Sequence, residues 1–312
     1  MVNISDRTVL ITGVGGFIGR YVARHFIEQG WAVIGTDNSP PENAPLANLT
    51  AYRRLQLPAP ELANLLQEYA PQVCIHCAGR ASVGLSVTDP TADFYSNTLL
   101  TLEMLNALRL NAPKCRFIFL SSAAVYGNPQ SLPISEEQPT QPLSPYGFHK
   151  LQGEQLCLEF AKIYGLPTAS VRIFSAYGPG LRRQVMWDIC QKAIVQNSVN
   201  LQGTGRESRD FIHALDIARA LLLIATKAPM EGEAYNLATG EEVTIDTLAS
   251  HILTSLEYPN LPHFDGIIPV GNPLNWQADI SKLRALGFSP AVSLDRGVKT
   301  FTSWCRAELV GV

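Results

Sequence analysis

The sequence lacks an excess of charge of either sign and lacks any long hydrophobic run. Of its 312 residues 16% are charged, and 24 basic against 27 acidic residues leave a formal net charge of −3. No stretch of about 18 apolar residues occurs, so we expect no membrane-spanning helix. The absence of a basic excess argues against nucleic acid as a partner. The N-terminal residues MVNISDRTVLITG do not have the pattern of a signal peptide, so we expect a soluble cytoplasmic protein.

The chain has six cysteines, and their spacing does not suggest disulfides. They lie among apolar residues, as the reduced core thiols of cytosolic proteins do. Cys74 and Cys77 form the motif C-I-H-C, which could also indicate a metal or redox site. Because the segment VCIHCAG has the pattern of a buried strand and no second pair follows at zinc-site spacing, we predict core thiols and no bound metal.

Short apolar runs alternate with amphipathic stretches through the first half of the chain. Such runs predict strands, and the longer stretches between them predict helices. The alternation is typical of an α/β protein with a Rossmann-type, doubly wound parallel sheet and helices on both faces. We expect strands at 7–12, 31–36, 72–77, 115–120 and 168–173, and helices at 17–29, 60–70, 91–110 and 145–164.

The pattern changes after about residue 175. The following helical patterns are separated by segments rich in proline and glycine, and few strands are expected. The second half therefore predicts a smaller, mostly helical lobe, of the kind that supplies substrate selectivity in α/β proteins. Its expected helices are 185–197, 214–227 and 244–256.

A glycine-rich segment, TGVGGFIG, follows the first predicted strand and opens the first predicted helix. Gly13, Gly16 and Gly19 would allow a tight turn, close approach of the backbone to a pyrophosphate, and close packing of helix on strand. Asp37 lies 18 residues after Gly19, near the spacing expected of a ribose-binding carboxylate; the alternative is a solvated loop carboxylate. Since a carboxylate there accepts a 2′-hydroxyl and repels a 2′-phosphate, the sequence predicts NAD rather than NADP.

Tyr146 and Lys150 are four residues apart in SPYGFHK, so a helix would place them on one face. A catalytic tyrosine must lose its proton near neutral pH, although its ordinary pKa is about 10. A lysine ammonium one turn away, together with an oxidised nicotinamide, can lower that pKa. Ser122 follows the apolar segment CRFIFL and could hold the substrate oxygen that the tyrosine deprotonates. We therefore predict that Ser122, Tyr146 and Lys150 are catalytic.

These motifs resemble those of the extended short-chain dehydrogenases/reductases that act on nucleotide sugars, the NAD-dependent epimerase/dehydratase family. The resemblance covers nearly the whole chain and implies a nucleotide-diphosphate sugar as substrate. We expect an NAD-binding Rossmann domain over residues 1–174, to which the chain returns near 207–238, and a substrate-binding lobe over 175–312. The segments that carry the resemblance are TGVGGFIG, TDNS, HCAG, LSSAAVYGNP, SPYGFHK, RIFSAYGPG, GTGRESRDFIHALDIARA, YNLATG and ADISKLRALGFSP.

The resemblance also implies roles for single residues. Arg209 in ESRDFIH matches an arginine that binds the substrate diphosphate, and Ser122 and Ser175 are implied on the substrate side. Without the resemblance, Arg209 beside Asp210 would be an ordinary salt-bridged residue. The implied cofactor-binding residues are Gly13, Gly16, Phe17, Ile18, Gly19, Asp37, Asn38, Cys77, Ala78, Gly79, Asn97, Tyr146 and Lys150.

Two departures from the family pattern concern the substrate contacts. Ser175 stands where the family usually has asparagine, and this shorter donor weakens the contact expected with the phosphate or sugar. Asn275 stands where relatives often have an arginine for a second contact with the diphosphate. The sequence therefore predicts a diphosphate site that depends mainly on Arg209.

The residues after Ser122 separate the reactions of the family. Dehydratases of this kind place Asp and Glu there to eliminate water, whereas this chain has Ala123 and Ala124. The segment SSAAVYGNP most resembles the UDP-glucose/galactose 4-epimerase group, which implies epimerisation through a 4-keto sugar. An NAD(P)H-dependent 4-ketoreductase of a nucleotide deoxy-sugar is the alternative, and a non-catalytic NAD-binding scaffold is a second one. His149 is expected to point off the face of Tyr146 and Lys150.

The family tends to dimerise through two helices of each subunit, which implies a homodimer. The corresponding helices here are 91–110 and 145–164. Their leucine and phenylalanine side chains could face a partner or, alternatively, the sheet. The residues in question are Leu99, Leu102, Leu156 and Phe160.

Overall fold

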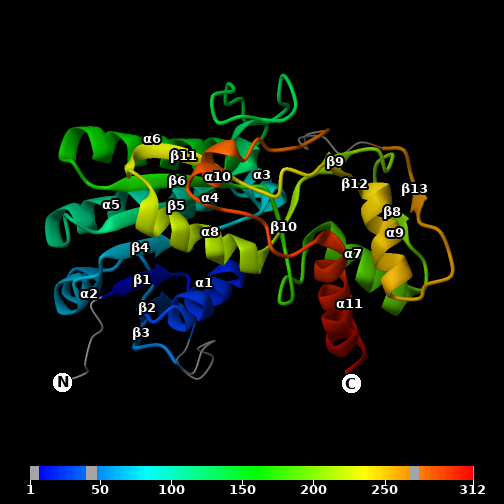
Figure 1. The fold of residues 1–312 in the computed structure, drawn as a ribbon, viewed down its shortest axis with the longest axis horizontal. Coiled ribbons are helices and arrows are strands. Elements are labelled where there is room, and N and C mark those ends of the chain that lie inside the picture. Colours follow the sequence, from blue (N-terminus) through cyan, green and yellow to red (C-terminus); the bar gives the residue numbers. More distant parts are fainter. Residues whose placement is uncertain (1–6, 40–47, 268–273, 312) are drawn as a thin grey trace.

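A seven-stranded sheet forms the centre of the computed structural model, which describes residues 7–39, 48–267 and 274–311 (Figure 1). Its strands are β1 (Thr8–Thr12), β2 (Ala32–Asp37), β3 (Ala51–Arg54), β4 (Val73–His76), β5 (Arg116–Ser122), β6 (Thr168–Ile173) and β11 (Glu231–Leu237). They lie in the order β11-β6-β5-β4-β1-β2-β3, and all neighbours pair in parallel. The order reverses between β1 and β4, so the predicted Rossmann-type, doubly wound α/β class is confirmed.

The central strands are buried along their length, and most of their residues are apolar or small. All five residues of β1 and all six of β6 are buried. Strands of this composition occur where helices cover both faces of a parallel sheet. Both faces are covered here.

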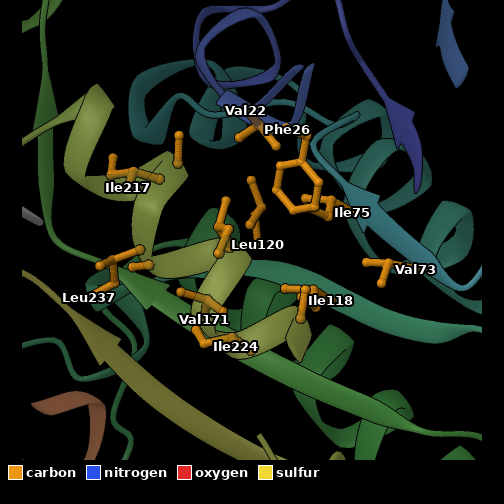
Figure 2. Close-up of a cluster of buried hydrophobic side chains, with 14 of the residues drawn as sticks. Val22, Phe26, Val73, Ile75, Ile118, Leu120, Val171, Ile217, Ile224 and Leu237 are labelled. Atoms are coloured by element: carbon orange, nitrogen blue, oxygen red, sulfur yellow. The ribbon is translucent and has the colours of Figure 1, made fainter. Parts of the chain in front are cut away.

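One face of the sheet packs against α1 (Phe17–Glu28) and α8 (Ala214–Lys227). Figure 2 shows Phe26 of α1 and Ile217 and Ile224 of α8 in one cluster with Leu120 of β5. Each side chain of this size contributes about 1.5–3 kcal/mol when it is removed from water. This cluster fixes α1, and with it the glycine-rich segment at its start.

The other face packs against α2 (Glu61–Tyr69), α5 (Leu100–Asn111) and α6 (Pro145–Tyr164). The sequence sets both ends of α6. The Ser144 side chain accepts a hydrogen bond from Gly147 N, Pro145 occupies the first turn, and Gly165 ends the helix with φ of 66°. Phe160 is buried in this core, so it faces the sheet rather than a partner subunit.

A separate apolar core lies between α7 (Gln184–Gln191), α9 (Ile245–Ser255) and α11 (Leu294–Val310), beside the sheet (Figure 1). This part is mostly helical, as the sequence predicts. Its short strands pair outside the central sheet. They are β7 (Ser175–Tyr177) with β10 (Phe211–His213), β9 (Ser208–Arg209) with β12 (Val243–Thr244), and β8 (Asn200–Leu201) with β13 (His263–Phe264).

Several elements differ from the sequence prediction. The strands β3 and β11 were not expected, because AYRR and EGEAYNL have no continuous apolar run. The helix expected over 91–110 consists of α4 (Pro90–Phe94), a π-helical turn (Tyr95–Leu99) and α5. A π-helical turn (Lys192–Gln196) also follows α7. The remaining short helices are α3 (Val83–Thr88), a 3₁₀ turn (Ala123–Val125) and α10 (Ser281–Ala285).

The six cysteines are all free thiols. Burial raises the pKa of the Cys77 thiol to about 12, so it stays protonated at neutral pH. Over residues 7–39, 48–267 and 274–311, no cluster of three or more His, Cys, Asp or Glu side chains could hold a metal ion. Within the same ranges no helix is long and apolar enough to cross a membrane.

A buried ion pair joins α6 to the sheet. The Arg172 guanidinium of β6 donates to both Glu154 carboxylate oxygens, at 3.0 Å from Nε and 2.8 Å from Nη2. Arg172 also donates to the Tyr126 hydroxyl at 2.8 Å. The Ser121 hydroxyl, next to Ser122, donates to the same carboxylate. The pair therefore holds the end of β5 and the middle of α6 in one arrangement.

Glu154→Gln should lower the free energy of unfolding by about 3–5 kcal/mol, because it leaves the buried Arg172 charge without its counterion. Urea denaturation followed by circular dichroism measures this loss. Glu68→Gln is the control, since it breaks the exposed Arg53–Glu68 pair of 3.3 Å, which should contribute less than about 1 kcal/mol. Equal losses in the two variants would contradict the structural role given to the buried pair.

Candidate active site

The predicted site residues gather at the carboxyl ends of the parallel strands. Gly13 follows β1, Asp37 ends β2, Cys77 follows β4 and Ser122 ends β5. In a doubly wound sheet, ligands bind in the crevice outside these strand ends, at the point where the strand order reverses. The described sheet reverses between β1 and β4, next to the glycine-rich segment.

The glycine-rich segment turns sharply between β1 and α1. Gly13 has φ of +64°, and a Cβ there would lie 2.7 Å from Ala78 N. A Cβ at Gly19 would collide with the Gly13 carbonyl oxygen. The Gly16 amide donates to that same carbonyl at 3.0 Å. Only glycine fits at positions 13 and 19, so the start of α1 and its free amides remain open to a phosphate.

Asp37 lies directly against this segment. The Gly15 amide donates to Asp37 Oδ2 at 2.8 Å, and the amide and hydroxyl of Ser39 donate to Oδ1 at 3.1 and 3.0 Å. The carboxylate is therefore held at the end of β2 rather than free in solvent. Asn38 is exposed beside it, and its carbonyl accepts from Arg54 Nε at 3.1 Å.

The loop after β4 lies against the glycine-rich segment at Gly13. Cys77 N donates to the Thr12 carbonyl at 3.1 Å, and Ala78 N lies 3.3 Å from Thr12 Oγ1. A Cβ at Gly79 would lie 2.8 Å from Asn97 Oδ1. Asn97 is buried, and neither of its side-chain polar atoms has a partner within the described ranges.

These features fit a dinucleotide. An unpartnered buried amide provides donors and an acceptor to a polar ligand, and the Gly13 turn leaves backbone space for a pyrophosphate. Phe17 and Ile18 are half-buried at the start of α1, where their amides are the first of the helix. The residues that would line the bound cofactor are thus brought together from four segments of the chain.

Ser122, Tyr146 and Lys150 meet where β5 ends and α6 begins. Lys150 Nζ donates to the Leu120 carbonyl of β5 at 2.9 Å. It lies 4.9 Å from the centroid of the Phe119 ring and 5.8 Å from that of the Tyr146 ring. Tyr146 and Lys150 share one face of α6, as their spacing predicts.

Burial opposes the charged forms of Tyr146 and Lys150. It raises the pKa of the Tyr146 phenol, while the Ser122 hydroxyl, as a hydrogen-bond partner, and the Arg183 charge lower that pKa. Burial lowers the pKa of the Lys150 amine to about 8, and the Asp93 charge raises it. In the protein without its cofactor, desolvation therefore outweighs the neighbours that lower the pKa of Tyr146, and a lowered pKa with oxidised nicotinamide bound stays a prediction.

Arg209 lies on the side of the second lobe. Its Nη1 donates to the Ser208 and Leu274 carbonyls at 2.6 and 3.1 Å, and its guanidinium lies 5.4 Å from the centroid of the Trp276 ring. No carboxylate within the described ranges forms an ion pair with it. Burial lowers the pKa of Arg209 to about 10, so the guanidinium is still charged at neutral pH.

Asp210 does not pair with Arg209. Its carboxylate accepts from the Thr239 amide at 2.8 Å and from the Gly240 amide at 2.9 Å. The salt-bridge alternative for Arg209 is therefore wrong. Ser175 pairs with Phe211 in β7 and β10, two residues from Arg209, and Asn275 is exposed next to Leu274.

Two residues of this region, Arg183 and Asp93, were not identified from the sequence. Arg183 precedes α7 and donates to the Ala81 carbonyl in the loop after β4. Asp93 is fully buried on α4 and accepts a hydrogen bond from His149 Nδ1 at 2.6 Å. No motif marks these contacts, because each joins residues far apart in the chain. His149 points toward α4, off the face of Tyr146 and Lys150.

Comparison with known proteins identifies the family. A model described as the NAD dependent epimerase/dehydratase family matches residues 9–238. The chain is 30% identical over 304 residues to a protein of Methanocaldococcus jannaschii described as a putative UDP-glucose 4-epimerase, covering 96% of this chain and 98% of that protein.

Two solved structures are similar over nearly the full length. One is the UDP-N-acetylglucosamine 4-epimerase of Methanobrevibacter ruminantium in complex with UDP-N-acetylmuramic acid, with a TM-score of 0.89, 28% identity, and coverage of 98% of this chain and 100% of that chain. The other is the UDP-glucose 4-epimerase of Thermus thermophilus in complex with NAD, with a TM-score of 0.84 and 26% identity. The match covers 96% of this chain and 99% of that chain. The chain belongs to the NAD-dependent epimerase/dehydratase family and is one of its nucleotide-sugar epimerase-type enzymes, with the fold of an extended short-chain dehydrogenase/reductase.

Proposed function

We propose that this enzyme inverts carbon 4 of a nucleotide-diphosphate sugar through a 4-keto intermediate. The observation that carries the proposal is the meeting of Ser122, Tyr146 and Lys150 at the end of β5, followed by Ala123 and Ala124. Both alanines lie in the 3₁₀ turn next to Ser122, where a dehydratase would need carboxyl groups to eliminate water. The site therefore has groups for moving a proton and none for dehydration at these positions.

Tyr146 acts as the general base in this mechanism. Its phenolate takes the proton from the C4 hydroxyl of the sugar, and the Ser122 hydroxyl holds the same oxygen. When bound, NAD⁺ would supply the acceptor and donor for the C4 hydride, and its positive charge would favour the phenolate that burial disfavours. Tyr146 then gives its proton back to the C4 oxygen, so that no net proton is consumed. The sugar must present its opposite face between the two steps.

Lys150 supports the phenolate from within the protein. Its amine lies one helical turn from Tyr146 and is held by the Leu120 carbonyl at 2.9 Å. The positive charge of Lys150 favours the tyrosinate, and its two remaining donor positions are available to the hydroxyls of the cofactor ribose. This second role matches the position of Lys150 between β5 and the crevice.

Replacing Tyr146 by phenylalanine should reduce turnover of the sugar by about 10²- to 10⁴-fold, because the general base is lost. The variant should keep its cofactor, since the phenol contributes little to that binding. Coupled assays measure turnover, and denaturation followed by chromatography identifies the released nucleotide. Unchanged turnover would contradict the role of Tyr146.

The same measurement on the parent protein separates the epimerase from the ketoreductase. An epimerase returns its hydride and should release about one equivalent of NAD(H) when it is denatured. A ketoreductase exchanges its cofactor in every cycle, so release of no nucleotide, or of NADP(H), would favour that alternative. Asp37 at the glycine-rich segment supports NAD.

Arg209 is proposed to bind the substrate diphosphate. Its guanidinium is charged, has no carboxylate partner within the described ranges and lies at the edge of the second lobe near Ser175. Planar guanidinium groups bind phosphates through two parallel hydrogen bonds. The solved relative from Methanobrevibacter ruminantium carries UDP-N-acetylmuramic acid, and we propose a UDP-sugar as the substrate here.

Arg209→Lys should raise the KM for the nucleotide sugar by about tenfold and change kcat by less than about twofold, because the charge stays but the bidentate geometry is lost. Steady-state kinetics measure both constants. Arg206→Lys is the matched control, since Arg206 is exposed three residues earlier in the chain. Equal KM values for the two variants would exclude the diphosphate role of Arg209.

We also propose a cytoplasmic homodimer. The six free thiols fit a reducing compartment. The outer surface of α4, α5 and α6 exposes large apolar side chains that a second copy of the chain would cover. The exposed side chains are Phe94, Tyr95, Leu110, Phe148, Ile163 and Tyr164.

Light scattering of the purified protein should give twice the chain mass of 34.1 kDa, and a monomer at micromolar concentration would contradict the dimer.

A further inference from the structure

A buried hydrogen-bonded pair of side chains lies between α4 and α6, the helix that carries Tyr146 and Lys150. His149 Nδ1 donates to Asp93 Oδ2 at 2.6 Å, across 56 positions of the sequence. The Asp93 side chain is fully buried and that of His149 is 11% exposed. The pair joins α4 to the first turns of α6, and His149 immediately precedes Lys150. The mechanism described above does not use either residue.

The second oxygen of the Asp93 carboxylate points to an uncompensated charge. Asp93 Oδ1 is buried and has no hydrogen-bond partner in the described part of the chain. Burial of a carboxylate is costly unless cations or donors compensate it. The imidazole of His149, through its hydrogen bond, and the ammonium of Lys150, through its charge, both compensate the Asp93 carboxylate.

The Asp93 charge acts on both catalytic side chains. It raises the pKa of Lys150, whereas burial lowers that pKa. Burial has the larger effect, so the pKa of Lys150 is lowered to about 8. It also raises the pKa of the Tyr146 phenol. Other elements contribute further groups to the same region. They are Glu154 on α6, His76 and Cys77 at the end of β4, Ser122 on β5, and Arg183 before α7.

We propose that Asp93 and His149 are positioning residues, which fix the first turns of α6 and place a buried negative charge behind Lys150. Neither residue touches substrate, cofactor or a reacting atom in this account. Asp93 favours the ammonium form of Lys150, and His149 moderates that effect by sharing the charge of Asp93. The proposal rests on the proposed catalytic role of Lys150, but its test measures Lys150 itself.

The two residues should shift the titration of Lys150 in opposite directions. Asp93→Asn removes the negative charge, so the ammonium is less stable and the midpoint falls by about one pH unit. His149→Gln removes the partner of the Asp93 carboxylate, so its charge acts more strongly on Lys150 and the midpoint rises. In each variant, the alkaline limb of the pH profile of kcat should shift in the same direction as the Lys150 midpoint.

NMR of protein labelled with ¹⁵N at the lysine side chain measures the midpoint, using the protein as purified and without sugar. The signal that disappears in Lys150→Arg identifies the residue. Because no turnover is needed, the result does not depend on whether the enzyme is an epimerase or a ketoreductase.

Asp89→Asn is the matched control. Asp89 lies one turn before Asp93, its ion pair with Arg80 is long at 3.6 Å and exposed, and asparagine can still cap α4. The control should leave the Lys150 midpoint unchanged.

Replacing a residue that only stabilises the fold would lower the melting temperature without moving the midpoint. The proposal is overturned if Asp93→Asn leaves the midpoint in place, or if both variants move it the same way. Should Asp93→Asn fail to fold, an unmoved midpoint in His149→Gln overturns it alone.

Discussion

The close packing of α6 on β5 is the constraint on which the site depends. A side chain at Gly153 would collide with the ring of Phe119, and one at Gly147 would lie 2.7 Å from the Ala124 carbonyl oxygen. Glycine at these two positions lets the helix lie directly on the strand. Lys150 can then reach the Leu120 carbonyl at 2.9 Å, and the start of α6 comes to the end of β5, where Ser122 lies. A helix further from the sheet would separate the side chains of Ser122, Tyr146 and Lys150.

The same packing creates the electrostatic problem of the site. Desolvation opposes the phenolate of Tyr146 and the ammonium of Lys150, so the chain must supply charge from its surroundings. Arg183 contributes from the second lobe and Asp93 from α4. Charges buried in the protein act through a low-dielectric interior, where electrostatic interactions are stronger than in water. The electrostatics of the site therefore depend on more of the molecule than Ser122, Tyr146 and Lys150.

The sequence was sufficient where function depends on local pattern. The glycine-rich segment, Asp37 and the Tyr146–Lys150 spacing each lie in one short stretch with a physical signature, and the structure brings these stretches to the carboxyl-end edge of the sheet. It was not sufficient where neighbours are distant in the chain. The strand β11 has a mixed composition and is defined by its pairing with β6, and Asp93 meets His149 only because α4 packs against α6.

The central claim is that the enzyme inverts carbon 4 without net oxidation or reduction of the sugar. The most direct measurement is incubation with UDP-, GDP-, dTDP- and CDP-sugars, with the product stereochemistry read by proton NMR. At least one of these sugars, and most directly a UDP-sugar, should convert to a mixture of its C4 epimers. No added cofactor should be consumed. A product reduced at carbon 4 in proportion to NADH or NADPH consumed, with no epimer formed, would contradict it.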